Sequence, residues 1–221
     1  MKKAVIFDMD GVLSDSEWIY VDKILEMLRE ENIFIEAEEI NDLFGKSMIF
    51  LCQELKSRYH LNKEASYYAD RVHALRDKHI KDHGLFPMEG GVELVEKLHG
   101  QGIPIAVASS APLETIRGNM MRFGIYDYID AIVSGLDCSR GKPYPDIYLE
   151  AASRLGLSPD DCVVVEDSAN GVAAAKNAGI YCIAFVPPKA VKQDVSRADR
   201  ILTGFAGVDP DSILGNETPI D

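Results

Sequence analysis

Oxygen-bearing and cationic side chains gather at four points of this sequence, close to short apolar runs. Asp8 and Asp10 follow the apolar run 4–7, and Ser109 and Ser110 follow a second such run. The other two groups are the loop Gly141-Lys142-Pro143 and the trio Glu166-Asp167-Ser168. A carboxylate can attack phosphorus and form an acyl phosphate, so this set of residue types suits phosphoryl transfer.

Several carboxylates at one edge of a sheet repel one another unless a cation lies among them. Magnesium prefers oxygen ligands, and together with Lys142 it would neutralise charge on a phosphoryl group. The Ser109 hydroxyl and nearby backbone N–H groups offer donors to the phosphoryl oxygens. The chain carries a net charge of −13, so an anionic ligand is attracted only where such a site concentrates positive groups.

Each of these groups also has a simpler structural interpretation. The segment 8–11 alone is more often a turn or helix cap, and Ser109-Ser110 alone is an ordinary turn. Lys142 would be a solvated loop lysine, and Glu166-Asp167 would be capping residues. Four groups in this order, all at strand ends or in adjoining loops, favour a functional site over coincidence.

The spacing of apolar residues predicts strands that alternate with helices over most of the chain. The predicted strands are 4–7, 103–108, 131–133, 162–165, 181–186 and 201–202. Such alternation predicts an α/β fold with a doubly wound parallel sheet. Ligands bind at the carboxyl ends of the strands in such sheets, which is where the four polar groups lie.

One segment interrupts the alternation of strands and helices. From residue 15 to residue 87 the sequence shows helical periodicity and no convincing strand. The helices expected there are one that begins near residue 16, then 48–55 and 65–80. We therefore predict an all-helical cap domain, 15–87, inserted into a core domain formed by 1–14 and 88–221.

The composition excludes several kinds of partner. The net charge of −13 argues against nucleic acid or an anionic membrane as the main partner. No apolar run approaches the roughly 20 residues that span a bilayer, and the first run is too short for a signal peptide. The four cysteines form no Cys-x-x-Cys pair, which is typical of a reduced, cytoplasmic protein. A monomer is the default expectation.

Taken together, the four groups resemble the motifs of the haloacid dehalogenase-like superfamily. The motifs stand here as Phe7-Asp8-Met9-Asp10-Gly11-Val12, Val107-Ala108-Ser109-Ser110, Gly141-Lys142-Pro143 and Val165-Glu166-Asp167-Ser168. The resemblance covers nearly the whole chain and implies a Rossmann-like core, with the helical insert similar to the family's small C1 cap. Within the superfamily the sequence resembles the branch of β-phosphoglucomutase and 2-deoxyglucose-6-phosphatase.

The resemblance implies a role for each matching residue. Asp8 would be the nucleophile that becomes an aspartyl phosphate, and Asp10 would be the general acid and base. Ser109 would bind the phosphoryl group, and Lys142 would neutralise charge around it. The implied magnesium ligands are Asp8, the backbone carbonyl of Asp10, Glu166 and Asp167. An aspartate at position 10 is similar to the phosphatases and phosphomutases, whereas the family's dehalogenases lack an acid there.

Two departures from the mutase pattern favour hydrolysis. Met48 stands where β-phosphoglucomutase has an arginine that grips the second phosphate of its substrate. The segment 111–113, Ala-Pro-Leu, stands where the mutase has a Lys-Asn pair. The resemblance thus implies a magnesium-dependent phosphatase of small phosphorylated metabolites, with sugar phosphates as the default. Further substrate contacts are expected from Ser110, Glu17 and Lys46.

Two alternatives stay open at this point. A β-phosphoglucomutase-type phosphomutase shares the first half-reaction and then returns the phosphoryl group to a sugar instead of to water. A non-catalytic receiver-like module also combines a phosphoacceptor aspartate, an acidic pair, a hydroxyl and a lysine around magnesium. Those modules arrange the groups in a different order along the chain and lack an inserted cap, which places them far behind the enzyme.

Overall fold

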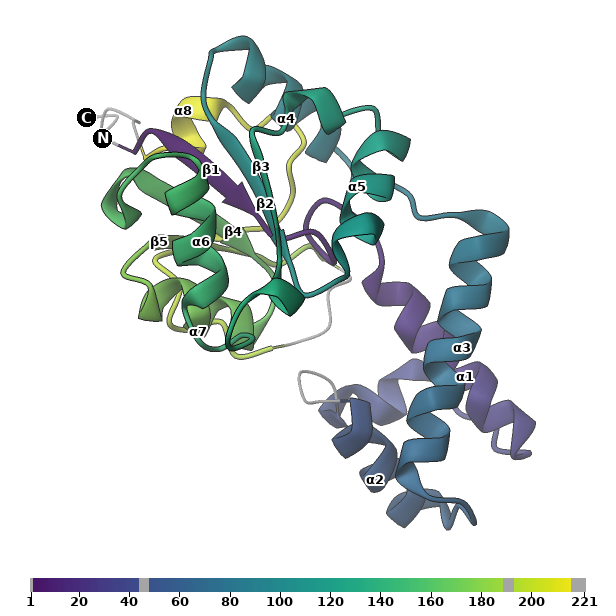
Figure 1. The fold of residues 1–221 in the computed structure, drawn as a ribbon. Coiled ribbons are helices and arrows are strands. Elements are labelled where there is room, and N and C mark those ends of the chain that lie inside the picture. The colour runs from purple at the N-terminus through teal and green to yellow at the C-terminus, as the bar shows by residue number, and fades with distance from the viewer. Residues whose placement is uncertain (1, 44–47, 189–192, 216–221) are drawn as a thin grey trace. The chain divides into compact units, whose positions relative to one another are not determined.

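A computed structural model of the chain describes residues 2–43, 48–188 and 193–215 (Figure 1). One sheet has the strand order β3-β2-β1-β4-β5-β6, and every neighbouring pair is parallel. The strands are β1 Ala4–Phe7, β2 Ile105–Ser109, β3 Ala131–Ser134, β4 Cys162–Glu166, β5 Tyr181–Phe185 and β6 Arg200–Leu202. The predicted α/β fold with a doubly wound parallel sheet is confirmed.

Helices cover the sheet on both faces, as the crossover connections of a parallel sheet require (Figure 1). The helices of this part are α4 Gly91–Gly100, α5 Leu113–Arg122, α6 Asp146–Arg154, α7 Ala169–Asn177 and α8 Pro210–Ile213. Short 3-10 turns occur at Tyr126–Tyr128, Gly135–Asp137 and Pro159–Asp161. Because helices cover both faces, the side chains on both sides of the central strands are buried. These strands are therefore mostly apolar and do not alternate between apolar and polar residues.

The first strand lies in the middle of the sheet and is fully buried. Its residues Ala4 and Ile6 pack against α6 and α7 in one cluster of buried side chains. Small residues supply much of the helix side of this cluster, including Ala151, Ala152 and Ala174. The strand is therefore held on both edges and against helices, so the residue that follows it has a fixed position.

The second strand starts two residues later than the sequence predicted. Gly102 adopts a left-handed φ of 71°, which ends helix α4 and turns the chain. The N–H of Ile103 then donates to the carbonyl of Leu98 at 3.0 Å. Ile103 thus belongs to the exit of α4, and β2 begins only at residue 105.

Two predicted site residues are the last residues of strands, whereas the sequence analysis placed them just after those strands. Ser109 pairs with Ser134 across β2 and β3. Glu166 pairs with Ala184 across β4 and β5. Ladder pairing therefore continues one residue further than the apolar runs, because backbone hydrogen bonding does not depend on whether the side chain is apolar.

Residues 16–85 form a second compact unit, separate from the unit that holds the sheet. Its elements are α1 Glu17–Glu30, a 3-10 helix Ala37–Leu43 that the periodicity did not predict, α2 Met48–Tyr59 and α3 Ala65–His83. This unit has its own apolar core, with Leu28, Leu55, Tyr68 and Val72 among its fully buried residues. The division of the chain into a core domain and a cap domain stays a prediction. Across the described ranges, no helix combines the length and apolarity of a membrane span.

Candidate active site

A buried group of charged side chains lies at the carboxyl ends of the two central strands. Asp8 follows β1 directly, and Glu166 ends the neighbouring strand β4. The Lys142 ammonium lies 2.5 Å from a carboxylate oxygen of Asp8 and 2.5 Å from one of Glu166. The side chains are only 9%, 8% and 1% exposed for Lys142, Asp8 and Glu166. Three residues from distant parts of the chain thus form one desolvated ion-pair cluster.

Both oxygens of the Glu166 carboxylate accept hydrogen bonds from the protein. The oxygen that contacts Lys142 also accepts from the Tyr148 hydroxyl at 3.1 Å. The other oxygen accepts from the Ser168 backbone N–H at 2.7 Å and from its hydroxyl at 3.0 Å. With four donors, this carboxylate is held in one orientation, and it in turn fixes the position of the lysine.

Helix α7 begins where this carboxylate lies. The Ser168 hydroxyl accepts from the Gly171 N–H at 3.0 Å and so caps the helix, which starts at Ala169. A Cβ atom added at Gly171 would fall on the Glu166 carboxylate. Glycine at this position therefore makes room for the carboxylate against the first turn of α7.

Three of these supporting residues were not named as site residues from the sequence: Tyr148, Ser168 and Gly171. Tyr148 is fully buried on α6, and its ring lies below the lysine, with Nζ 5.1 Å from the ring centroid. A buried tyrosine hydroxyl needs a hydrogen-bond partner. The available signal was a tyrosine in the segment that follows the lysine loop.

Asp8, Glu166 and Asp167 form a group that suits a divalent metal ion. One carboxylate oxygen from each lies within 4.8 Å of the others. The donors are all carboxylate oxygens, which hard divalent cations prefer. The Asp10 side chain is outside this group, and residue 10 forms an isolated bridge with Ser14. The donor set therefore fits a divalent metal ion of the kind that the sequence predicted.

Burial and the lysine set the charge states of the cluster. Burial raises the pKa of Asp8 to about 7, against the opposing effect of Lys142. Burial also acts to raise the pKa of Glu166, but Lys142 and the Ser168 donors outweigh it and lower that pKa. The two carboxylates raise the pKa of Lys142 well above its usual value despite burial. Glu166 and Lys142 are therefore charged at neutral pH, while Asp8 lies near its titration point.

The remaining predicted residues have more varied positions. Ser109 is buried at the end of β2, which neighbours β1, so it lies at the same edge of the sheet as Asp8. Ser110 follows it and is exposed. Glu17 begins α1 in the helical unit, but its side chain is not described, and Lys46 lies outside the described residues.

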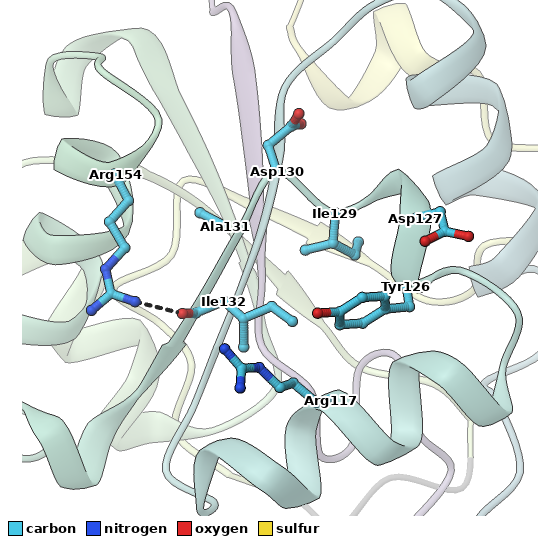
Figure 2. Close-up of a pocket in the computed structure, with 8 residues that line it drawn as sticks. All are labelled: Arg117, Tyr126, Asp127, Ile129, Asp130, Ala131, Ile132 and Arg154. Atoms are coloured by element: carbon cyan, nitrogen blue, oxygen red, sulfur yellow. Dashed lines mark hydrogen bonds between the residues drawn. The ribbon is translucent and has the colours of Figure 1, made fainter.

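A cavity of about 450 Å³ lies elsewhere, at the edge strand β3 (Figure 2). Arg154 and Arg117 approach Ile132 from two sides, and Arg154 donates to the Ile132 carbonyl at 2.7 Å. None of the predicted site residues lines this cavity. Arg154 occupies a backbone acceptor of an edge strand, which limits pairing with other chains. This cavity is therefore separate from the charged cluster.

Comparisons with known proteins agree with this geometry. The sequence model of the haloacid dehalogenase-like hydrolases matches residues 5–185. Hexitol phosphatase B of Escherichia coli is 31% identical over 190 residues, which cover 85% of each chain. An HAD family hydrolase from Deinococcus radiodurans, solved with bound phosphate and sodium, has a TM-score of 0.82 at 28% identity and covers 99% of this chain and 98% of that one. A putative β-phosphoglucomutase from Thermotoga maritima has a TM-score of 0.74 at 28% identity, covering 97% of each chain.

The chain belongs to the haloacid dehalogenase-like hydrolase family. The predictions of the family and of the enzyme class, a phosphoric monoester hydrolase, are confirmed. Membership of a hydrolase family also favours the enzyme over the receiver-like alternative. The predicted cytoplasmic location and monomeric state stay predictions.

Proposed function

We propose that this protein is a magnesium-dependent phosphatase that hydrolyses small phosphorylated metabolites, sugar phosphates in the first place, through an aspartyl phosphate at Asp8. One observation carries the proposal: Lys142 joins the buried carboxylates of Asp8 and Glu166, with Asp167 beside them. A related phosphatase acts on hexitol phosphates by its name. A similar solved structure holds phosphate.

The first half-reaction needs Asp8 as a carboxylate, because only the ionised form is an effective nucleophile. Burial raises the pKa of Asp8 to about 7, and the charge of Lys142 opposes that rise, which keeps a large fraction ionised at neutral pH. The Asp8 oxygen attacks phosphorus, and the bond from phosphorus to the ester oxygen breaks. Asp10 donates a proton to the leaving alcohol oxygen.

In the second half-reaction Asp10, now a carboxylate, takes a proton from a water molecule. The water oxygen attacks phosphorus of the aspartyl phosphate, inorganic phosphate leaves, and Asp8 is regenerated. Ser109 and Lys142 donate to the phosphoryl oxygens in both steps and thereby stabilise the charge that the transferring group carries. One phosphate ester and one water give one alcohol and one phosphate, with Asp10 returned to its acid form.

The proposed metal ligands are Asp8, the Asp10 backbone carbonyl, Glu166 and Asp167. Glu166 contributes to this set mainly through its charge, because its two oxygens already accept four hydrogen bonds. When bound there, Mg²⁺ would neutralise charge between the nucleophile and the phosphoryl oxygens. Lys142 supplies the second positive charge, because its ammonium contacts the carboxylates of both Asp8 and Glu166.

The test is a screen for phosphate release from sugar phosphates, hexitol phosphates and nucleotides, with Mg²⁺ and with EDTA. We expect activity only with the metal, and Asp8→Asn should lower kcat by about a thousandfold or more, because an amide is a poor nucleophile. Asp160→Asn removes the same charge from an exposed turn and serves as the matched control. Rapid quenching should trap phosphate on Asp8 in the wild type.

Near-normal activity of Asp8→Asn would exclude the proposed mechanism. The mutase alternative has its own assay: β-glucose 1-phosphate would be converted to glucose 6-phosphate without release of inorganic phosphate. The similarity to a putative β-phosphoglucomutase is the reason to include this isomerisation assay. We expect phosphate release instead, since Met48 stands where the resemblance to β-phosphoglucomutase implies an arginine that grips the second phosphate.

A further inference from the structure

Ser134 has no part in the proposed chemistry, yet it lies directly beside a residue that does. It ends β3, and its Cα is the register partner of Ser109 in the parallel β2–β3 pair. Both serines are 1% exposed. Two buried hydroxyls therefore stand next to each other at the edge of the sheet where the charged cluster lies.

The Ser134 hydroxyl links two loops by hydrogen bonds of defined direction. It accepts from the Leu136 N–H at 3.2 Å and donates its one proton to the Ala111 carbonyl at 2.7 Å. The Ala111 N–H in turn donates to the Ser109 hydroxyl oxygen at 3.1 Å. Ala111 is thus held at its carbonyl by Ser134 and at its N–H by Ser109.

This arrangement determines what the Ser109 proton can do. The Ser109 oxygen accepts from the Ala111 N–H, so its single proton is directed elsewhere and is available to a phosphoryl oxygen. The loop after β3 has little freedom to move against the loop after β2, because a Cβ atom added at Gly135 would lie 3.3 Å from the Ser110 Cα and 3.6 Å from the Ser109 carbonyl oxygen. The loop after β3 is packed directly on the loop after β2.

We propose that Ser134 is a positioning residue: by holding the Ala111 carbonyl, it keeps the Ser109 hydroxyl aimed as a donor to the substrate's phosphoryl group. This rests on the proposed function, in which Ser109 binds that group. Without the Ser134 proton the Ala111 carbonyl loses its donor, and the segment 110–112 is free to shift. The Ala111 N–H then moves off Ser109, whose proton is no longer directed.

The experiment is a double-mutant cycle between Ser134→Ala and Ser109→Ala, assayed with p-nitrophenyl phosphate and Mg²⁺. Ser134→Ala should lower kcat/KM about ten-fold when Ser109 is present, which is the usual effect of losing one hydrogen bond. In the Ser109→Ala background the same change should cost less than about two-fold, because a residue that acts through another shows no separate effect. Competitive inhibition by inorganic phosphate should weaken in parallel.

Two variants guard against a trivial loss of folding. Ser134→Thr keeps the hydroxyl and should retain most of the activity, and Ser158→Ala deletes an exposed hydroxyl bonded to Asp161 and should change nothing. If Ser134→Ala does not fold, Ser134→Cys replaces it in the cycle, since a thiol is close in size but a weak donor.

The outcomes separate the two proposals. Equal losses from Ser134→Ala in both backgrounds, no loss at all, or a threonine variant as impaired as the alanine variant would each overturn the role of Ser134 while Ser109→Ala still impairs the enzyme. If Ser109→Ala itself keeps wild-type kcat/KM, the phosphoryl-binding role of Ser109 is wrong, and the inference on Ser134 falls with it.

Discussion

The charged residues at the end of the sheet differ from those on the helical unit in how much water they retain. In the cluster, the Lys142 ammonium contacts the carboxylates of Asp8 and Glu166, and all three side chains are at most 9% exposed. On the helical unit, Arg71 and Glu30 form a two-pronged pair in which both side chains are about 40% exposed. The contacts have similar lengths, but their surroundings are opposite.

Ion pairs in such different surroundings are expected to affect the stability of a fold differently. Taking charges out of water costs several kcal/mol per ion, and their mutual attraction often fails to repay that cost. An exposed pair avoids the cost and gains little. The proposed function accounts for the buried cluster: a carboxylate that is to attack phosphorus would be kept poor in water and beside a fixed positive charge.

The largest effect on stability is expected when the shared cation is removed. Lys142→Met keeps most of the length of the side chain but leaves two buried carboxylates without a cationic partner, which should lower the free energy of unfolding by about 3 to 5 kcal/mol. Urea unfolding at pH 8 with EDTA measures this. Lys176→Met breaks the more exposed pair with Asp199 and should cost less than about 1 kcal/mol. Similar losses in the two variants would refute the contrast between buried and exposed pairs.

The second effect is on Asp8 and depends on pH. Because burial raises its pKa from 3.8 to about 7, the folded state binds a proton more tightly than the unfolded state. The stability that this proton gives is present below pH 4 and is lost as the pH rises to about 7. Asp8→Asn has no such loss, so above pH 7 it should be more stable than the wild type by about 4 kcal/mol without metal.

Unfolding midpoints in urea between pH 4 and pH 8, with EDTA, test this expectation. The gap between Asp8→Asn and the wild type should widen as the pH rises. A gap that narrows would mean that the folded protein holds Asp8 as a carboxylate more readily than the unfolded chain does. The same substitution is expected to abolish turnover, so one variant would gain stability and lose activity.

The sequence was sufficient for the sheet and for the residues that meet in the cluster. Strands β1 and β4 are runs of apolar residues, and polar residues after parallel strands must come to one edge, so the meeting of Asp8 with Glu166 could be predicted. The role of Lys142 beside Asp8 was implied by the family resemblance. Its contact with Glu166 was not foreseen, because the loop's own sequence does not say which carboxylates an ammonium will bridge.

The supporting contacts depend on details of packing that no local pattern contains. Tyr148 reaches Glu166 only because α6 is rotated so that this ring faces β4, and Gly171 matters only because a carboxylate occupies the space of its missing side chain. Ser134 lies one residue beyond the predicted strand 131–133, and its bond to Ala111 depends on the β2–β3 register. The 3-10 helix Ala37–Leu43 was missed because seven residues give too little periodicity.

The smallest effect is expected from the exposed pair on the helical unit. Arg71→Ala removes two contacts to the Glu30 carboxylate, which at present lower the pKa of Glu30 through the Arg71 hydrogen bonds. Because both side chains are about 40% exposed, the loss in unfolding free energy should stay below about 1 kcal/mol and shrink further at high salt. Arg71→Lys is the matched control, since it keeps the charge but not the two-pronged geometry. Urea unfolding at low and high salt decides the question: a loss as large as that of Lys142→Met would show that exposure does not separate these two regions after all.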